Sequence, residues 1–156
     1  MTPPAAHPPV TSPAALIAER LGGRAALDRT ITTEVELADA VEQGLPTRAL
    51  VHVVEQVGDP LGTQAVYRVV GNVRTLQRKR ATEARLSADE SDRLARLARI
   101  LVRAEAALGT RDKAVRWLQR ENRALGGRVP LSLLHSDAGA VVVERILGRI
   151  EHGVYS

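Results

Sequence analysis

The side chains best suited to recognising another molecule belong to the segment VRTLQRKR, which follows Gly71-Asn72. An arginine can bond a guanine edge through two hydrogen bonds, a glutamine can read adenine, and a threonine can bond a base or a phosphate. Further charges in such a segment would bind phosphates, which position a protein on DNA without reading its sequence. The candidate DNA-binding residues are Arg74, Thr75, Gln77, Arg78, Lys79 and Arg80.

The residues around this segment predict two helices joined by a tight turn. Apolar residues between 65 and 69 repeat at helical spacing, Gly71-Asn72 marks the turn, and a second helix begins near Val73. Two helices joined by a three- or four-residue turn that contains glycine form the helix-turn-helix pattern. Val73 and Leu76 can then face the core and leave the polar side chains outside. An exposed basic helix without a ligand is the alternative interpretation.

The distribution of charge favours a contact with nucleic acid in the middle of the chain. Residues 1–67 carry a net charge of −4, residues 68–103 carry +6, and residues 104–156 carry +2. A basic segment between acidic or nearly neutral ones is the electrostatic pattern expected of nucleic-acid binding. Arginine, however, outnumbers lysine 20 to 2. A GC-rich genome alone can produce that bias, so composition does not decide the question.

Residue types that support catalysis or metal binding are scattered. The four histidines, His7, His52, His135 and His152, show no spacing typical of metal ligands or of a nucleophile and its base. No glycine-rich phosphate loop follows a predicted strand. The absence of cysteine excludes disulfides and thiolate metal sites. We therefore expect no catalytic activity, no metal and no cofactor.

Composition predicts an all-α protein of the cytoplasm. Phenylalanine is absent and aromatic residues make up 2% of the chain, so a core must be built from Ala, Leu, Val and Ile. No apolar run approaches the roughly 20 residues of a membrane span. The first residues, MTPPAAHPPVTSP, lack the basic and apolar regions of an export signal. We expect no membrane contact.

The chain divides into four predicted segments. Residues 1–12 are rich in proline and are expected to be a disordered leader. Residues 13–84 hold the N-terminal helices and the helix-turn-helix. Thr33 with Glu36 predicts a capping box at the start of one of these helices, and Leu50, Val53, Val54 and Val57 repeat at helical spacing in a valine-rich segment. Residues 85–108 form a connecting helix opened by a capping box, and its arginines, Arg96, Arg99 and Arg103, are expected on a solvated face. Residues 109–156 form a small helical module.

Three helices are predicted in this last module. Thr110 caps a helix that is expected to continue through Leu125, until Gly126-Gly127 ends it. Pro130 then starts a short helix, and Ser136-Asp137 opens a final one that Gly153 ends.

The module also carries a family resemblance. The pattern WL..EN.ALGGRVPLSLL, followed by G...V...LGRIEHGVYS, resembles the C-terminal toxin-binding domain of the Xre/MbcA/ParS antitoxins. The preceding RTLQRKR and LSADESDRLARLARI resemble the region that leads from helix-turn-helix to toxin-binding domain in this family. The resemblance covers roughly residues 14–156. In place of the capping threonine that the family usually has before Pro130, this chain has Val129.

The resemblance implies a type II toxin–antitoxin system. The partner would be a RES-domain toxin, an ADP-ribosyltransferase-like enzyme that consumes NAD or transfers from it. The antitoxin's C-terminal module would block the entrance to the toxin's active site. Its helix-turn-helix would bind the operon promoter for autorepression, as a homodimer within a larger complex. The alternative is a stand-alone transcription regulator whose C-terminal module only dimerises.

The resemblance also implies which residues face the toxin. Among the positions that the resemblance implies, we expect Trp117 to lie in the core and Gly126 and Gly127 to form a turn. We expect the end of the chain to contact the toxin directly. Tyr155 combines a large apolar ring with a polar tip, a combination that is common in interfaces. The implied toxin-binding positions are Trp117, Asn122, Leu125, Gly126, Gly127, Pro130, Arg149, Glu151, His152, Gly153, Val154, Tyr155 and Ser156.

Overall fold

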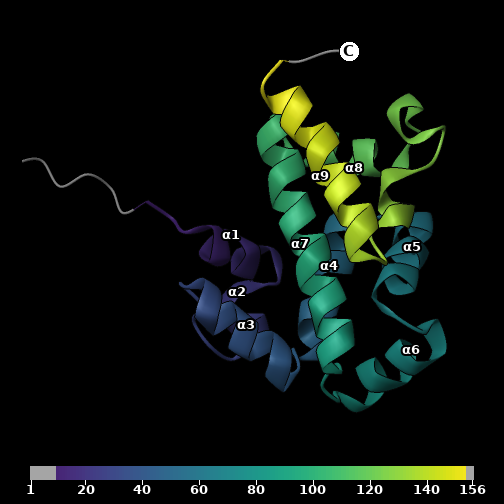
Figure 1. Cartoon of the computed structure of the whole chain (residues 1–156). Coiled ribbons are helices and arrows are strands. Elements are labelled where there is room, and N and C mark those ends of the chain that lie inside the picture. Colours follow the sequence, from purple (N-terminus) through teal and green to yellow (C-terminus); the bar gives the residue numbers. More distant parts are fainter. Residues whose placement is uncertain (1–9, 154–156) are drawn as a thin grey trace, which may run out of the picture.

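A long central helix organises the fold, and the other helices pack around it (Figure 1). The computed structural model describes residues 10–153, apart from the side chains of Pro60 and Leu61. Over this range the chain forms α-helices and short 3-10 helices but no β-strand, so the predicted all-α fold is confirmed. In chain order the elements are α1 (Pro13–Arg20), α2 (Gly23–Leu27), α3 (Glu34–Gln43), α4 (Thr47–Val57), α5 (Pro60–Val70), α6 (Val73–Thr82), α7 (Ala88–Leu108), α8 (Arg111–Gln119), η1 (Arg123–Leu125), η2 (Pro130–Leu133) and α9 (Asp137–Glu151).

The central helix, α7, is part of the core along its whole length. Its first turn is closed by the predicted capping box, in which Ser87 Oγ accepts from the Glu90 N–H at 3.1 Å and a Glu90 carboxylate oxygen accepts from the Ser87 N–H at 2.8 Å. Further along, Leu94, Leu97 and Ala104 are fully buried. The helix packs against α1, α3 and α5 and also against α8 and α9. The N-terminal and C-terminal helices therefore share one hydrophobic core.

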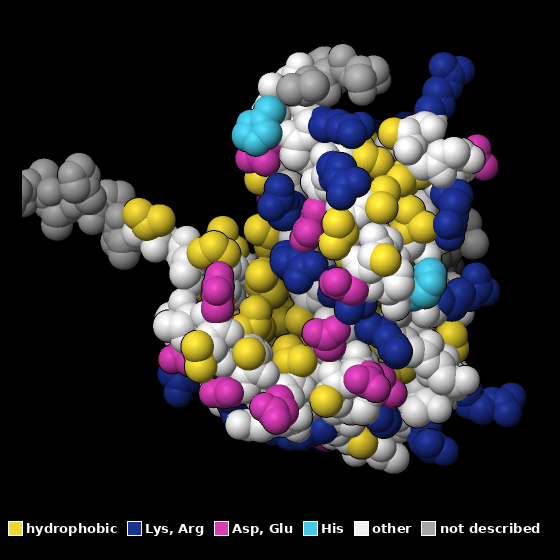
Figure 2. Space-filling view, in the orientation of Figure 1, with side chains coloured by type: hydrophobic (Ala, Val, Ile, Leu, Met, Phe, Trp, Pro, Cys, Tyr) yellow, Lys and Arg dark blue, Asp and Glu magenta, His cyan; other side chains and the backbone are white. Residues whose placement is uncertain are grey.

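The arginines of α7 correct one prediction. Arg99 Nε lies 2.7 Å from a carboxylate oxygen of Glu144 on α9. Arg96 lies 2.9 Å from Asp92 of α7 itself and 3.8 Å from Asp137 at the start of α9. Only 12% of the Arg96 side chain is exposed. A freely solvated face was wrong for these two residues, because α9 brings carboxylates alongside them. Figure 2 shows basic and acidic side chains alternating along this seam.

Helices α3 and α4 begin where the local sequence predicts, whereas the short helix α2 was not predicted. Thr33 and Glu36 form the expected capping box at α3, and the N–H groups of Thr32 and Thr33 lower the pKa of the exposed Glu36 carboxyl. The valine-rich segment that becomes α4 is helical, as its spacing predicts, with Leu50 and Val53 fully buried. Local hydrogen bonds and apolar spacing are therefore sufficient to place these helices.

The proline-rich leader and the expected lack of a membrane span were two further predictions from the sequence. Residues 1–9 of the proline-rich leader lie outside the described residues. Within residues 10–153, every helix is too short or too polar to span a lipid bilayer.

Candidate functional sites at the two ends of helix α7

The first site is the helix pair α5–α6, beside the start of α7. Gly71 ends α5, and Asn72 caps α6 by accepting a hydrogen bond from the Thr75 N–H at 3.0 Å. The turn and the start of the second helix lie where the sequence predicts them. Tyr67 on α5 and Leu76 on α6 are buried, which anchors both helices on the core. The two helices thus form a helix-turn-helix.

The outer face of α6 presents polar side chains at helical spacing. Arg74, Gln77 and Arg78 are exposed, whereas Leu76 is fully buried on the opposite face. Arg80 is exposed as well, and its Nη1 lies 3.5 Å from the Tyr67 hydroxyl. These arginines form no ion pair with any residue from 10 to 153, and the DNA major groove is wide enough to admit a helix that carries such side chains.

Two of the six predicted DNA-binding residues have a different environment. Thr75 is half-buried. Lys79 points toward α7, where its Nζ lies 2.7 Å from a carboxylate oxygen of Glu90, and 22% and 12% of the two side chains are exposed. Burial alone would raise the pKa of Glu90, but hydrogen bonds from Lys79 and from the Ser87 N–H, together with the lysine charge, lower it. Lys79 therefore fastens α6 to α7.

The second site lies at the other end of α7, in the C-terminal module. Its first helix, α8, ends at Gln119, so the predicted continuation through Leu125 was wrong. Arg120 is extended, with φ −104° and ψ 148°. The reason is the side chain of Asn122, whose Oδ1 accepts from the Ala124 N–H at 2.9 Å, an alternative to helical hydrogen bonding that asparagine favours. Residues 123–125 form the 3-10 turn η1 instead.

The turn after η1 closes on itself. The Asn122 N–H donates to the Arg128 carbonyl at 3.0 Å, and the Gly127 N–H donates to the Asn122 carbonyl at 2.9 Å. Gly126 and Gly127 have φ values of 64° and 83°, a conformation that other residues rarely adopt. A Cβ atom added to either glycine would meet no neighbouring atom, so the backbone conformation of the turn, and not a lack of space, favours glycine here.

The remaining predicted toxin-binding residues between Trp117 and Pro130 have mostly structural roles. Trp117 was expected in the core; it is half-buried and packs against the core from outside. Pro130 is buried at the start of η2. Val129 gives η2 no side-chain cap, which agrees with the loss of the family's threonine. Leu125 is half-buried at the turn and does not belong to the core cluster.

The end of α9 is exposed and points away from the rest of the molecule (Figure 1). Arg149, Glu151, His152 and Gly153 are all exposed, and the last helical residue is Glu151. The other predicted contact residues, Val154, Tyr155 and Ser156, lie outside the described residues.

Sequence reasoning missed one group of side chains in this module. They are exposed cations on α8 and the following turn, and a count of charges over residues 109–129 would have found them, with six basic side chains against two acidic ones. No group of three or more residues in the described part of the chain could hold a metal ion.

Comparison with known proteins places both sites in a family. A family model described as the antitoxin Xre-like helix-turn-helix domain matches residues 36–99. A second, described as the antitoxin Xre/MbcA/ParS C-terminal toxin-binding domain, matches residues 103–153.

Curated relatives agree with these matches. Antitoxin Xre of Photorhabdus laumondii is 34% identical over 120 residues, which cover 74% of this chain and 78% of the relative. Antitoxin Xre of Yersinia enterocolitica is 39% identical over 87 residues, or 53% of this chain and 57% of the relative. That of Pseudomonas putida is 38% identical over 81 residues, or 52% and 51%. The chain belongs to the Xre antitoxin family, with an Xre-like helix-turn-helix followed by a toxin-binding domain.

Proposed function

We propose that this protein is the antitoxin of a type II system, which neutralises a RES-domain toxin and represses its own operon in the cytoplasm. The observation that carries the proposal is the pairing of a helix-turn-helix with a toxin-binding module on one shared core around α7. The chain itself catalyses no reaction and needs no cofactor. The active site that it controls belongs to the toxin.

The DNA-binding part of the proposal rests on the outer face of α6. Arg74 and Gln77 would enter the major groove, with Arg78 and Arg80 on phosphates. In an Arg78→Ala variant, binding to a promoter fragment should weaken, and the slope of log affinity against log salt should fall by roughly one unit if one phosphate contact is lost. Arg24, exposed on α2, provides the control variant Arg24→Ala. A slope that stays unchanged in Arg78→Ala would place the DNA elsewhere.

The toxin-binding part rests on the exposed end of α9. We expect residues from Arg149 to Ser156 to enter the toxin's active-site cleft, because this end projects from the molecule and is exposed as far as it is described. Deletion of Val154–Ser156 should leave folding and promoter binding intact but weaken inhibition of NAD consumption by the toxin. Inhibition that persists at equal protein concentration would rule out a blocking tail.

The family resemblance further suggests a homodimer. Light scattering on the purified chain measures this directly: a mass near twice the 16.8 kDa of the chain is expected. A monomer that binds its promoter would contradict the dimer without affecting the rest of the proposal.

A further inference from the structure

We propose that the toxin-binding module holds the toxin through a second surface, which is basic and docks an acidic face of the toxin outside its active site. This inference rests on the proposed function. The surface comprises α8 and the turn that follows it, and we call it the α8 surface. Its cations are Arg111, Lys113, Arg116, Arg120, Arg123 and Arg128.

The cations of the α8 surface lack acidic partners of their own. All six are exposed, and none forms an ion pair with any residue between 10 and 153. Some arginines elsewhere do form ion pairs, as Arg20 does with Glu105 and Arg99 with Glu144, whereas the exposed arginines of α6 form none within residues 10–153. Because residues 109–129 hold only two acidic side chains against these six, the surface has a local charge of +4. Such a field attracts and orients an acidic partner.

The backbone that presents part of this charge is pre-organised. Arg123 and Arg128 flank a turn whose N–H and carbonyl groups are bonded to one another, including the pairs between Asn122 and Arg128 and between Gly127 and Asn122. A turn that is already ordered loses little conformational entropy on binding, so more of the electrostatic attraction remains as affinity.

The tip of this turn also offers an apolar contact. Leu125 lies between the two arginines in sequence, is half-buried and stands apart from the core cluster. An apolar group with a charged, solvent-accessible rim has the composition of a protein–protein interface. An electrostatic site for phosphates alone would not need the leucine.

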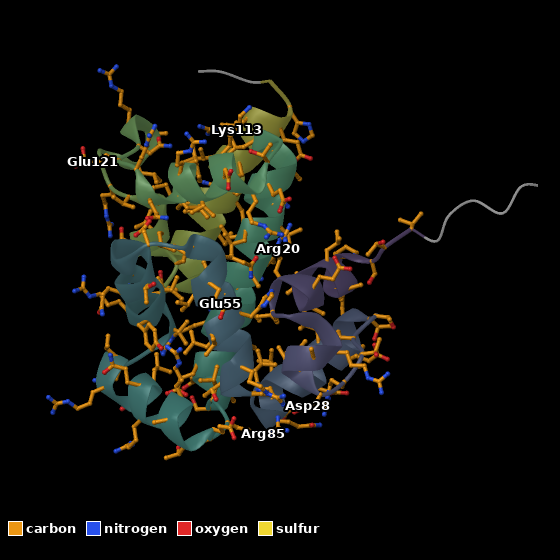
Figure 3. All side chains as sticks on the ribbon, turned by 180° about the vertical axis from the view of Figure 1, so that it is seen from behind. Arg20, Asp28, Glu55, Arg85, Lys113 and Glu121 are labelled. Atoms are coloured by element: carbon orange, nitrogen blue, oxygen red, sulfur yellow. The ribbon has the colours of Figure 1, made fainter. Side chains whose placement is uncertain are left out.

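The position of the α8 surface favours a protein partner over DNA. Helix α6 adjoins the start of α7, which is about 30 Å long for its 21 residues, whereas α8 follows the end of α7. Helix α8 packs back along α7, so that Arg116 and Arg120 line a pocket with Asp59, just before α5. The turn that carries Arg123 and Arg128 lies on the side away from α6 (Figure 1). Figure 3 shows Lys113 and Glu121 at one end of the molecule and Arg85, just after α6, at the other. The matched toxin-binding domain, residues 103–153, includes the whole α8 surface.

A second copy of the chain fits the surface less well. The nearest acidic counterpart is α3, which carries Glu34, Glu36, Asp39 and Glu42. Helix α3 lies at the opposite corner of the molecule from the turn after α8 (Figure 1). Contact between the two would be head-to-tail, an arrangement that forms open chains unless the rotation happens to close.

The test uses the full chain, a RES-domain toxin purified from the same operon, and surface plasmon resonance at low and high ionic strength. Arg123→Glu should slow association with the toxin roughly 10-fold at low salt and reduce its salt dependence. Arg123→Lys should restore both, and promoter affinity should not change. Arg24→Glu, which alters the charge equally on the exposed face of α2, is the matched control and should bind like the unmodified chain.

Several results would overturn the docking proposal. If Arg123→Glu and Arg128→Glu both bind the toxin at the unmodified rate, the α8 surface does not contact it. A loss of promoter binding in these variants would assign the surface to DNA, and a change in oligomeric state would assign it to a second copy. If the unmodified chain binds no toxin at all, the proposed function fails and the docking fails with it, an outcome distinct from the others.

Discussion

Helix α6 and the α8 surface carry the same kind of charge on different scaffolds. On α6, exposed arginines stand on a regular helix that Leu76 anchors in the core. On the α8 surface, the helix stops early and the last cations stand on a glycine turn, in which η1 has no buried residue. The major groove of DNA admits a regular α-helix, whereas the surface of a protein partner can be complementary to an irregular turn. The difference in scaffold therefore favours different partners for the two surfaces, in line with the proposed binding of DNA at α6 and of the toxin at the α8 surface.

The largest expected effect tests whether the two regions share one core. Leu97 is fully buried and adjoins Val57 of α4 and Leu118 of α8 around a small cavity. Leu97→Ala should cost about 2–5 kcal/mol of unfolding free energy, and promoter and toxin binding should be lost together on warming. Urea unfolding followed by circular dichroism should show one transition. Two separate transitions would mean that the regions fold independently.

A matched substitution on the surface checks that the loss comes from the core. Val35 is 70% exposed on α3. Val35→Ala should change the unfolding free energy by no more than about 0.5 kcal/mol.

The second largest effect, that of Glu90→Ala, should distinguish the α6 region from the α8 surface. Glu90→Ala removes the carboxylate that holds Lys79 and caps α7, so it should cost about 1–3 kcal/mol. Because the lost contact positions α6, affinity for the promoter should fall while affinity for the toxin is retained, as measured on the folded protein at low temperature. Glu55, exposed on α4 and without an ion pair among residues 10–153, provides the control variant Glu55→Ala. If affinity for the promoter and affinity for the toxin fall equally, the contact between Lys79 and Glu90 does not position α6 specifically.

A smaller effect is expected at the other end. Asn122→Ala removes the cap of η1, a loss of about 0.5–2 kcal/mol by analogy with helix N-caps. The turn should then become less ordered, so that toxin affinity falls several-fold and promoter affinity does not change. Ser12→Ala removes the cap of α1 at a similar cost in stability. If it weakens toxin binding equally, the turn has no special role.

The smallest expected effect is a change in how the free energy of unfolding depends on pH. Since the pKa of Glu90 is lowered in the folded state, its contribution to stability is complete above the unfolded glutamate pKa of about 4.3 and is lost as the pH falls below that value. Glu90→Gln should flatten the pH dependence of unfolding in that range. Glu36, whose pKa is lowered as well, should leave a residual slope. An unchanged profile in Glu90→Gln would contradict the role of the Lys79 contact.

Sequence reasoning worked where interactions are local. The capping boxes of Thr33 with Glu36 and of Ser87 with Glu90 span three residues each, and both formed as expected. The start of α6 followed from Gly71-Asn72 for the same reason. The end of α8 was missed because Asn122 accepts from the Ala124 N–H and also forms backbone hydrogen bonds with Gly127 and Arg128, contacts that the helical pattern does not reveal.

Contacts between distant parts of the chain could not be predicted in this way. Arg99 and Glu144 are 45 positions apart, and only the packing of α9 on α7 brings them together. For the same reason, the spacing of α6 suggested six DNA-facing residues without showing that Lys79 turns inward to Glu90. Family motifs identified the toxin-binding module, and a count of charges could have identified its cations. That these cations form no ion pair within residues 10–153 required the structure.

The unbroken helix α7 sets a geometric constraint on any complex. Its 21 residues contain neither glycine nor proline, so no hinge lies between the α6 end and the α8 end. For the proposed partners, the toxin's azimuth around the DNA axis would be dictated by the antitoxin's own architecture. Operator half-sites would then have to be far enough apart that the toxins bound to neighbouring antitoxins do not clash. The shortest half-site spacing that still allows binding would therefore measure the width of the toxin.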